Sequence, residues 1–451
     1  MRLHPIATLF VVLILLAQSL HAREPIARTP LALETFDEVW QILNDSHFDT
    51  NFNGHNWQQV REKFRPRAAA ARSREAFRDV VQELLDLLAV SHLAIVPGEF
   101  TEEMELEETE NAKNPTGVEE ADEDDSGTVG LELRYSGKNL LVTRVEPNLP
   151  AAKAGVKPGW ILKRIRNTST ADLKQKTPKK LDDRRRDFLA WRAASKKLSG
   201  TPGTKIPLEF LNEKNRSVTL DLERVTVQGE PISFGTLPVL YAHLEESAVN
   251  SPRGHTVGLI RFNIWMLPTA LAFNKAIDQH RERAGLIIDL RGNIGGLVGM
   301  IIGTAGHFTP KPIALGTLIT RDNILKLPAN PRFVDSSGKR VQPFDRPVAI
   351  LVDELTASAS EVFAGGLQEH GRVRIFGRTT AGQALPAVYN KLPNGDALYH
   401  PVADFITGKG IRFEGRGVIP DEVVPLDRKT LLTGRDPVLE RALQWIDRSA
   451  K

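Results

Sequence analysis

The feature that most constrains this fold is a series of short apolar segments in the C-terminal half of the chain, each followed by a segment with helical spacing. Gly285–Leu290 is apolar but for one carboxylate, and Pro347–Val352 is apolar throughout. Such strands are buried on both faces, because a strand with one wetted face alternates apolar and polar residues. With helices expected over 295–307 and 358–370, the pattern predicts an α/β core over 231–425. Its sheet is expected to be mostly parallel and covered by helices.

The remainder of the 451-residue chain divides into segments of different composition, as expected for a length beyond one hydrophobic core. Residues 1–22 combine an early arginine, an apolar run and small residues for cleavage, which predicts a secretory signal peptide. The apolar run is shorter than the ~20 residues of a membrane span; an uncleaved anchor is the alternative. Residues 30–98 show helical spacing and predict a small helical bundle. Residues 426–451 predict a C-terminal amphipathic helix.

Two charged runs of opposite sign stand out between these segments. Residues 101–126 carry twelve acidic side chains against one lysine, which predicts a disordered acidic linker. A basic cluster lies between Lys174 and Arg186, inside a polar stretch over 167–200. We interpret both runs as solvated surface loops; a sharper hypothesis is that the linker folds back onto the basic stretch. Because the cluster has no interleaved aromatic residues, a nucleic-acid partner is not expected.

The residue types present also limit the chemistry. The chain has no cysteine, which excludes disulfide frameworks, thiolate zinc sites and a cysteine nucleophile. No metal-ligand cluster is evident in the sequence, and no glycine-rich dinucleotide loop opens a βαβ unit. We therefore expect neither a metal nor another cofactor.

Residues 127–230 show short strands separated by turns, with a short helix after the second strand. This order resembles a PDZ domain, through the loop at Gly130, the Leu149–Gly155 helix and a Pro-Gly turn before Trp160. The acidic residue usual after that turn is replaced by Trp160 itself. A PDZ domain adds a peptide strand to its sheet edge and holds the peptide's C-terminal carboxylate on backbone amides. The resemblance implies that Val129, Gly130 and Leu131 bind peptide.

A serine-containing motif lies where a buried strand passes into a helix. Thr356-Ala-Ser358-Ala-Ser360-Glu361 follows the strand at 347–352. A hydroxyl at such a junction is exposed, and the free amides of the first helical turn lie beside it. The position can therefore supply both a nucleophile and part of an oxyanion hole. The alternative is that these serines only cap the helix.

A glycine-rich loop is the second candidate element of a site. Asp289-Leu-Arg-Gly-Asn-Ile-Gly-Gly296 begins at the C-terminal end of the strand at 285–290. Open α/β sheets place ligands at that edge, and glycines let backbone amides approach a substrate closely. A phosphate-binding loop is the competing interpretation, but its lysine and its spacing are missing. A plain structural turn remains the other alternative.

Together these motifs resemble the tail-specific and carboxy-terminal processing proteases, a serine peptidase family. The resemblance extends from the PDZ-like segment through Gly377-Arg-Thr-Thr-Ala-Gly-Gln383 to Asp421. It implies that Ser358 is the nucleophile. It also implies that the oxyanion hole is formed by the amides of Ala359, Gly295 and Gly296.

The general base departs from the common pattern of this family. Its last motif ends in a catalytic lysine, and this chain has Gln383 there, which cannot accept a proton at a useful pH. The branch typified by the core of tricorn protease uses a histidine instead. By that resemblance His92 is the base, with Ser91 and Glu414 as supporting polar groups. Histidine suits the role because its pKa lies near neutrality and a third group can orient it. The alternative is a helix-end histidine bonded to backbone.

The sequence thus predicts an α/β core preceded by a helical bundle and a PDZ-like α+β domain. The chain is predicted to be an exported serine endopeptidase, located in the periplasm or outside the cell. Its expected substrates are proteins or peptides, some of them bound through their C-terminus. The main alternative is a catalytically inactive binder of peptides or apolar ligands on the same scaffold. A PDZ-anchored assembly factor is a third interpretation that explains fewer motifs.

Overall fold

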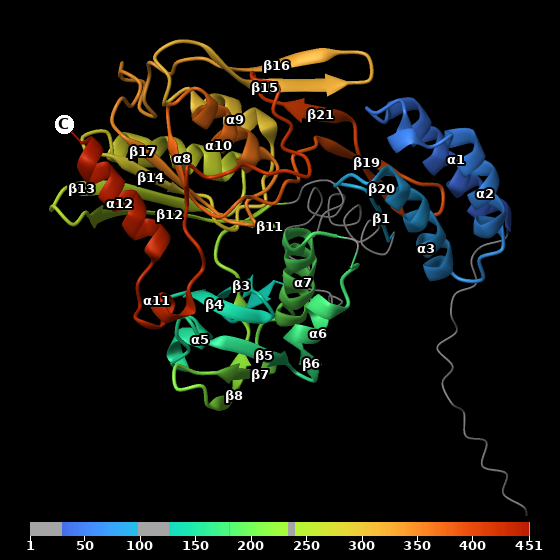
Figure 1. Ribbon diagram of the computed structural model, residues 1–451, viewed down its shortest axis with the longest axis horizontal. Helices are drawn as coiled ribbons and strands as arrows, with labels where there is room; N and C mark the ends of the chain where they lie inside the picture. The colour runs from blue at the N-terminus through green and yellow to red at the C-terminus, as the bar shows by residue number, and fades with distance from the viewer. Residues whose placement is uncertain (1–28, 98–125, 180, 233–239, 451) are drawn as a thin grey trace, which may run out of the picture.

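The computed structural model describes residues 29–97, 126–179, 181–232 and 240–450. It has a helical N-terminal part, a small mixed domain and a large core that carries the C-terminal helix (Figure 1). The predicted signal peptide at 1–22 lies outside the described residues. So does nearly all of the acidic linker at 101–126, and with it the hypothesis that the linker covers the basic stretch. In the described ranges, no helix combines the length and the apolar character needed to cross a membrane.

The N-terminal part is a three-helix bundle. Asn56 and Ser73 stand directly before the second and third helices. Their side chains accept hydrogen bonds from backbone amides one turn further on, which satisfies donors that a helix start leaves open. Apolar side chains from all three helices, including Phe36, Phe64 and Phe77, form one buried cluster. The helices are α1 (Thr29–Ser46), α2 (Trp57–Ala69) and α3 (Arg74–Leu85).

The helices of the bundle end shortly before the turn that carries Ser91 and His92. Helical structure ends at Leu88, because Ala89 and His92 adopt left-handed backbone conformations with φ of 53° and 60°. The chain then forms β1 (Ala94–Val96), which pairs antiparallel with β20 (Ala397–Pro401). The turn that carries Ser91 and His92 is therefore attached to the core through a shared sheet.

The small domain after residue 126 is built on a six-stranded antiparallel sheet. Its strand order is β3-β4-β5-β7-β8, with β6 attached to β5. Because β3 lies at the end of this order, one of its edges is free for pairing within the described part of the sheet. The strands are β3 (Leu131–Ser136), β4 (Asn139–Val145), β5 (Ile161–Ile165), β6 (Thr168–Ser169), β7 (Lys205–Leu211) and β8 (Ser217–Glu223). The short strands β2 (Gly127–Thr128) and β9 (Val225–Thr226) pair beside it.

The polar stretch at 167–200 is largely helical, and its basic cluster, interpreted above as a surface loop, is a loop only at 176–179 and 181–182. It contains α6 (Thr170–Gln175) and α7 (Asp183–Leu198), and α7 packs on the domain's own core. Ala190, Ala194 and Leu198 recur every four residues and are buried against the sheet. Small alanines at this spacing bury one face of a helix while its other faces stay basic. The short helix α5 (Pro150–Lys153) packs at the other end of the sheet.

The core is organised around a second six-stranded sheet with the order β12-β13-β14-β17-β18-β22. All neighbouring pairs are parallel except β12 with β13. In β14, Leu286 and Ile288 join the cluster under α8, α9 and α10, whereas Ile287 joins the cluster under α12. Both faces are thus covered, which explains why the strand is apolar throughout. The strands are β12 (Leu244–Asn250), β13 (Thr256–Phe262), β14 (Leu286–Asp289), β17 (Val348–Val352), β18 (Arg374–Gly377) and β22 (Glu422–Val423). The helices are α8 (Leu267–Gln279), α9 (Val298–Ala305), α10 (Ala359–Glu369) and α12 (Pro437–Ser449).

Smaller sheets, which the sequence did not predict, surround the core. Two of them have three strands each, in the orders β16-β15-β21 and β1-β20-β19. The second of these sheets brings the N-terminal bundle beside the core (Figure 1). The strands are β10 (Glu230–Ile232) and β11 (Leu240–Ala242), which pair with each other, and β15 (Ile313–Thr320), β16 (Ile324–Ala329), β19 (Ala387–Lys391) and β21 (Ala403–Ile406). A short helix, α11 (Arg428–Leu432), precedes α12.

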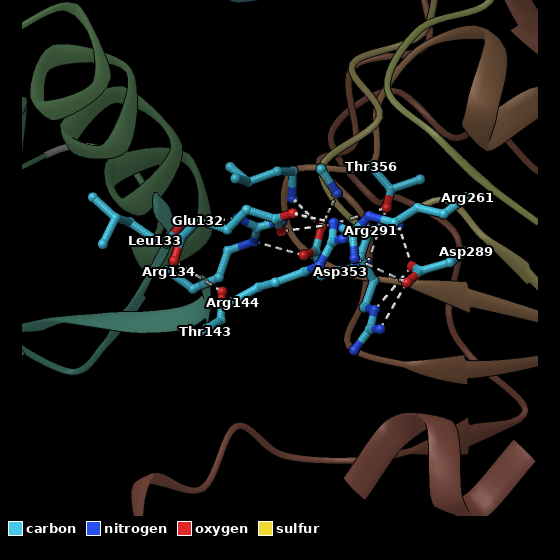
Figure 2. A network of polar contacts seen from close by, with 12 residues as sticks. Glu132, Leu133, Arg134, Thr143, Arg144, Arg261, Asp289, Arg291, Asp353 and Thr356 are labelled. Carbon is cyan, nitrogen blue, oxygen red and sulfur yellow. Dashed lines mark hydrogen bonds and ion pairs between the residues drawn. The ribbon is translucent and has the colours of Figure 1, made fainter. Parts of the chain in front are cut away.

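Buried ion pairs join the small domain to the C-terminal edge of the central sheet (Figure 2). Arg134 of β3 donates from Nε to Asp353 Oδ2 at 2.6 Å, just beyond β17. Glu132 accepts from Arg261 of β13, and Arg261 also pairs with Asp289 at the end of β14. Removing one partner of such a pair leaves a buried charge uncompensated. The network therefore fixes how the small domain sits against the loops that carry the candidate site.

Candidate active site

Ser358 occupies a strained turn between β17 and α10. Its backbone has φ 56° and ψ −123°, a region that non-glycine residues rarely adopt. Its amide donates to the Gln383 carbonyl at 2.8 Å and to Glu361 Oε2 at 3.1 Å. Its half-buried hydroxyl faces the Glu361 amide in a capping box at the start of α10, and it makes no hydrogen bond with a side chain in the described ranges. The turn therefore presents a hydroxyl that no other side chain engages, at the start of a helix.

The neighbouring serine is engaged in structure. Ser360 is fully buried; its hydroxyl accepts from Trp265 Nε1 at 2.9 Å and donates to Asn293 Oδ1 at 2.8 Å. Both of its main bonding directions are therefore used within the core. Of the two serines in the motif, Ser358 is the one whose oxygen is available for chemistry.

The glycine loop after β14 lies directly against this turn. A Cβ atom on Gly295 would come within 2.6 Å of Ser358 Cβ and 3.1 Å of the Ala359 amide nitrogen. The Gly295 amide already donates to Asn293 Oδ1 at 3.0 Å. The amides of Gly296 and Ala359 have no acceptor among the described residues. Two of the three predicted oxyanion donors are therefore unengaged beside the serine, and the third is occupied.

Ser91, His92 and Glu414 form a connected chain of hydrogen bonds, which we call the histidine relay. The Ser91 hydroxyl donates to Glu414 Oε2 at 2.9 Å, and its oxygen lies 2.6 Å from His92 Nδ1. The Ser91 amide donates to Glu414 Oε1 at 2.8 Å. The Glu414 carboxylate is buried, and this burial raises its pKa, while bonds from Ser91 and Ala384 oppose the rise. Burial lowers the pKa of His92 to about 4, so its ring is neutral at pH 7.

One peptide unit connects the relay to the serine turn. The carbonyl of Gln383 accepts from the Ser358 amide at 2.8 Å. The amide on the other side of the same peptide bond, that of Ala384, donates to Glu414 Oε2 at 3.2 Å. The described residues contain no direct hydrogen bond between the His92 ring and the Ser358 hydroxyl; catalytic bonds of this kind often tighten only when substrate binds. The structure thus gathers all four predicted residues around one loop.

Glu361 holds that loop in place. It is fully buried and accepts from Thr380 Oγ1, from the amides of Gly382 and Gln383, and from the Ser358 amide. Burial raises its pKa to about 7, against the lowering effect of these donors. Its contacts join the loop at 380–383 to the serine turn.

The predicted peptide-binding residues lie in the small domain, at the start of β3. The carbonyls of Val129 and Gly130 accept from the amides of Ala151 and Glu146, both at 3.0 Å. The Gly130 amide donates to Thr128 Oγ1 at 3.1 Å. Backbone groups of this loop are therefore used within the domain, while the adjoining β3 is an edge strand. No group of histidine and carboxylate side chains in the described part of the chain is placed to hold a metal ion.

Sequence reasoning missed two residues near the relay, Arg184 and Arg185. They lie in the first turn of α7 and reach the loop that carries Glu414. The signal available was the basic cluster itself, which an interpretation as a solvated loop set aside.

Comparisons with known proteins relate this chain to serine peptidases. The sequence model of peptidase family S41 matches residues 256–424, and that of the tricorn protease C1 domain matches residues 32–86. The carboxyl-terminal-processing protease of Synechocystis is 27% identical over 412 residues, which cover 88% of this chain and 84% of that protein. The chloroplastic C-terminal processing peptidase of Tetradesmus obliquus is 27% identical over 405 residues, which cover 87% and 78%.

Solved structures share the fold at lower identity. The photosystem II D1 C-terminal processing protease superposes with a TM-score of 0.56 at 23% identity, covering 90% of this chain and 98% of that one. Mature CPAF gives a TM-score of 0.62 at 14% identity, covering 94% and 99%. Fold and relatives together define the class of this protein, which is a serine peptidase. Residues 256–424 match the model of peptidase family S41, and the chain is similar over most of its length to carboxyl-terminal-processing proteases.

Proposed function

We propose that this chain is an exported endopeptidase that cleaves protein or peptide substrates with Ser358 as nucleophile and His92 as general base. The observation that carries the proposal is the Gln383–Ala384 peptide unit, which bonds to the Ser358 amide on one side and to Glu414 on the other. Through it, groups 323 positions apart in the sequence, Ser91 and Glu414, meet beside the serine turn.

The reaction proposed is acyl transfer. Ser358 Oγ attacks the scissile carbonyl carbon while His92 Nε2 takes the hydroxyl proton. The negative charge on the carbonyl oxygen is stabilised by the amides of Ala359 and Gly296, with Gly295 shaping the loop. His92 then gives its proton to the leaving amine as the carbon–nitrogen bond breaks. Water activated by the same histidine hydrolyses the acyl-enzyme.

The relay sets which nitrogen of His92 is free to act. An ionised Glu414 can only accept, so the single proton of Ser91 points to Glu414. The Ser91 oxygen then accepts from His92, which places the imidazole proton on Nδ1 and leaves Nε2 as the base. This arrangement needs no lysine at position 383. The backbone of Gln383, and not its side chain, bonds to the Ser358 amide and to Glu361.

We propose a supporting role for each remaining part of the chain. Residues 30–98 form the helical domain that supplies His92, 231–425 form the peptidase core, and 426–451 form a C-terminal helical segment. Residues 127–230 act as a PDZ-like domain that receives the substrate's C-terminus on Val129, Gly130 and Leu131; the edge position of β3 supports this. Residues 1–22 direct export to the periplasm or the extracellular space, with 101–126 as linker.

A labelled fluorophosphonate probe tests the proposal, because it modifies only an activated serine. We expect labelling at Ser358, lost in Ser358→Ala and reduced about a thousandfold or more in His92→Ala. Ser360→Ala is the matched control and should still be labelled. A second candidate function, an inactive peptide binder, is favoured by Gln383 in place of the family lysine. Unlabelled wild-type protein that still binds peptide would support that alternative.

A further inference from the structure

The first turn of α7 reaches from the small domain to the loop that carries Glu414. Arg184 donates from Nη1 to the Thr380 carbonyl at 3.0 Å and to the Arg416 carbonyl at 2.6 Å. Its Nη2 donates to the Gly415 carbonyl at 2.8 Å. One guanidinium therefore holds the loop after Glu414 together with the loop at 380–383, and both loops contact the relay or the serine turn.

Glycines on this loop make room for the arginines. A Cβ atom on Gly417 would lie 2.9 Å from Arg184 Nη1, and one on Gly415 would lie 3.3 Å from Arg185 Nη2. Both glycines have left-handed φ values, 75° and 76°, which other residues adopt only with strain. The loop is thus shaped for close approach by α7.

Arg185 supplies the charge that faces Glu414. Its Nη2 lies 4.0 Å from Glu414 Oε1, and its side chain is 27% exposed against 2% for the carboxylate. The other donors to that carboxylate, the Ser91 amide and hydroxyl and the Ala384 amide, are neutral. His92 lies one step further along the relay, and Arg184 binds the carbonyl of the next residue rather than the carboxylate.

We propose that Arg185 is a positioning residue, supplied by the small domain, whose charge keeps Glu414 ionised and thereby keeps His92 in the tautomer that can act as base. This inference rests on the proposed Ser358–His92 function. A protonated Glu414 can donate to Ser91, which lets Ser91 turn its own proton toward His92 Nδ1. The imidazole proton would then sit on Nε2, and no base would face the substrate. Arg184 contributes by holding the loop at the required distance.

The test follows the pH profile of fluorophosphonate labelling at Ser358 in full-length variants. Arg185→Gln should move the acidic limb to higher pH by about one unit, because it removes a positive charge near a buried carboxylate. Arg185→Glu should move it further, and Arg185→Lys should restore most of the wild-type profile. Labelling well above the limb should change little. Such a graded order depends on charge, whereas a purely structural role would not produce it.

Arg186→Gln is the matched control on the same helix. Arg186 bonds to Thr177, to the Lys174 carbonyl and to Asp183, all inside the small domain. The pH profile of labelling of the Arg186→Gln variant should coincide with that of the wild type. Thermal unfolding of each variant checks that it is folded. If labelling is His92-dependent but the Arg185→Gln and Arg186→Gln profiles coincide, this inference is overturned and the proposed function stands. If wild-type labelling does not depend on His92, both are overturned.

Discussion

Replacing Glu414 by glutamine removes one negative charge from the relay and leaves its shape almost unchanged. The carboxylate accepts three hydrogen bonds, from the Ser91 amide on Oε1 and from the Ser91 hydroxyl and the Ala384 amide on Oε2. A glutamine offers one oxygen and one NH₂ group. In either orientation of the amide, NH₂ faces at least one N–H donor, so one hydrogen bond is lost and one donor is left unpaired.

The size of the effect follows from which orientation forms. With its oxygen toward the Ser91 hydroxyl, the amide keeps the His92 tautomer and leaves the Ser91 amide unpaired, at a cost of about 1–3 kcal/mol. At 1.36 kcal/mol per tenfold, this corresponds to a loss of roughly 10- to 100-fold if it falls on the transition state. With NH₂ toward that hydroxyl, the tautomer is reversed, and a loss of about 10⁴ is typical of a wrong tautomer. We expect the labelling rate of Ser358 to fall by about 10- to 10⁴-fold, depending on the orientation that forms.

The assay is the second-order rate constant for fluorophosphonate labelling at pH 8, with Ser358→Ala as the blank. Glu422→Gln is the matched control. Glu422 lies in β22, shortly after Glu414 in the sequence, but pairs with Arg441 and Arg374 away from the relay. Urea unfolding should place the Glu414→Gln variant about 1–3 kcal/mol below the wild type. A labelling rate within twofold of the wild type, in a folded variant, would refute the reasoning about the tautomer.

Three further predictions concern the same site. Burial lowers the pKa of His92 to about 4 and raises the pKa of Glu414, so the acidic limb of labelling should follow the carboxylate and not the imidazole. An acidic limb at the ordinary histidine pKa of about 6.5 that stays in place in Glu414→Gln would contradict this. Gln383→Ala should keep at least a third of the labelling rate, since the backbone of residue 383 makes the connections; a hundredfold loss would assign the side chain a catalytic part. Ser360→Ala should lower the unfolding free energy by about 1–3 kcal/mol in urea, because it leaves Trp265 Nε1 without its acceptor and removes one of the two hydrogen bonds to Asn293 Oδ1. Unchanged stability would show that these bonds contribute nothing.

Local patterns in the sequence predicted the central part of the fold. The segments at 286–289 and 348–352 carry apolar side chains on both faces of the strand, apart from one carboxylate. The structure buries both of these faces. The serine turn was visible for the same reason, since it stands where one of these strands must end. His92 and Glu414 had no such local signal. Only the resemblance to a family suggested them, because nothing in either neighbourhood indicates the other.

Elements whose stability comes from distant partners escaped prediction. β1 is three residues long and exists through its pairing with β20, some three hundred positions away. In α7 the buried stripe consists largely of alanines among arginines and lysines, so its hydrophobic periodicity is weak although its packing is complete. Arg184 reaches the carbonyl of a residue 232 positions further along. A contact of that kind leaves no trace in composition or spacing.

The hydrogen bonds between Ser91 and Glu414 also bear on when a newly made chain could become proteolytically active. The ribosome releases residues in order, and domains fold as they emerge. The turn with Ser91 and His92 and the turn with Ser358 both precede residue 414, and the Ser91 hydroxyl gains its acceptor only when that carboxylate arrives. In the mechanism proposed above, a nascent or truncated chain that stops short of residue 414 lacks the group that orients Ser91 and His92. Full proteolytic activity is then reached only when synthesis is nearly complete.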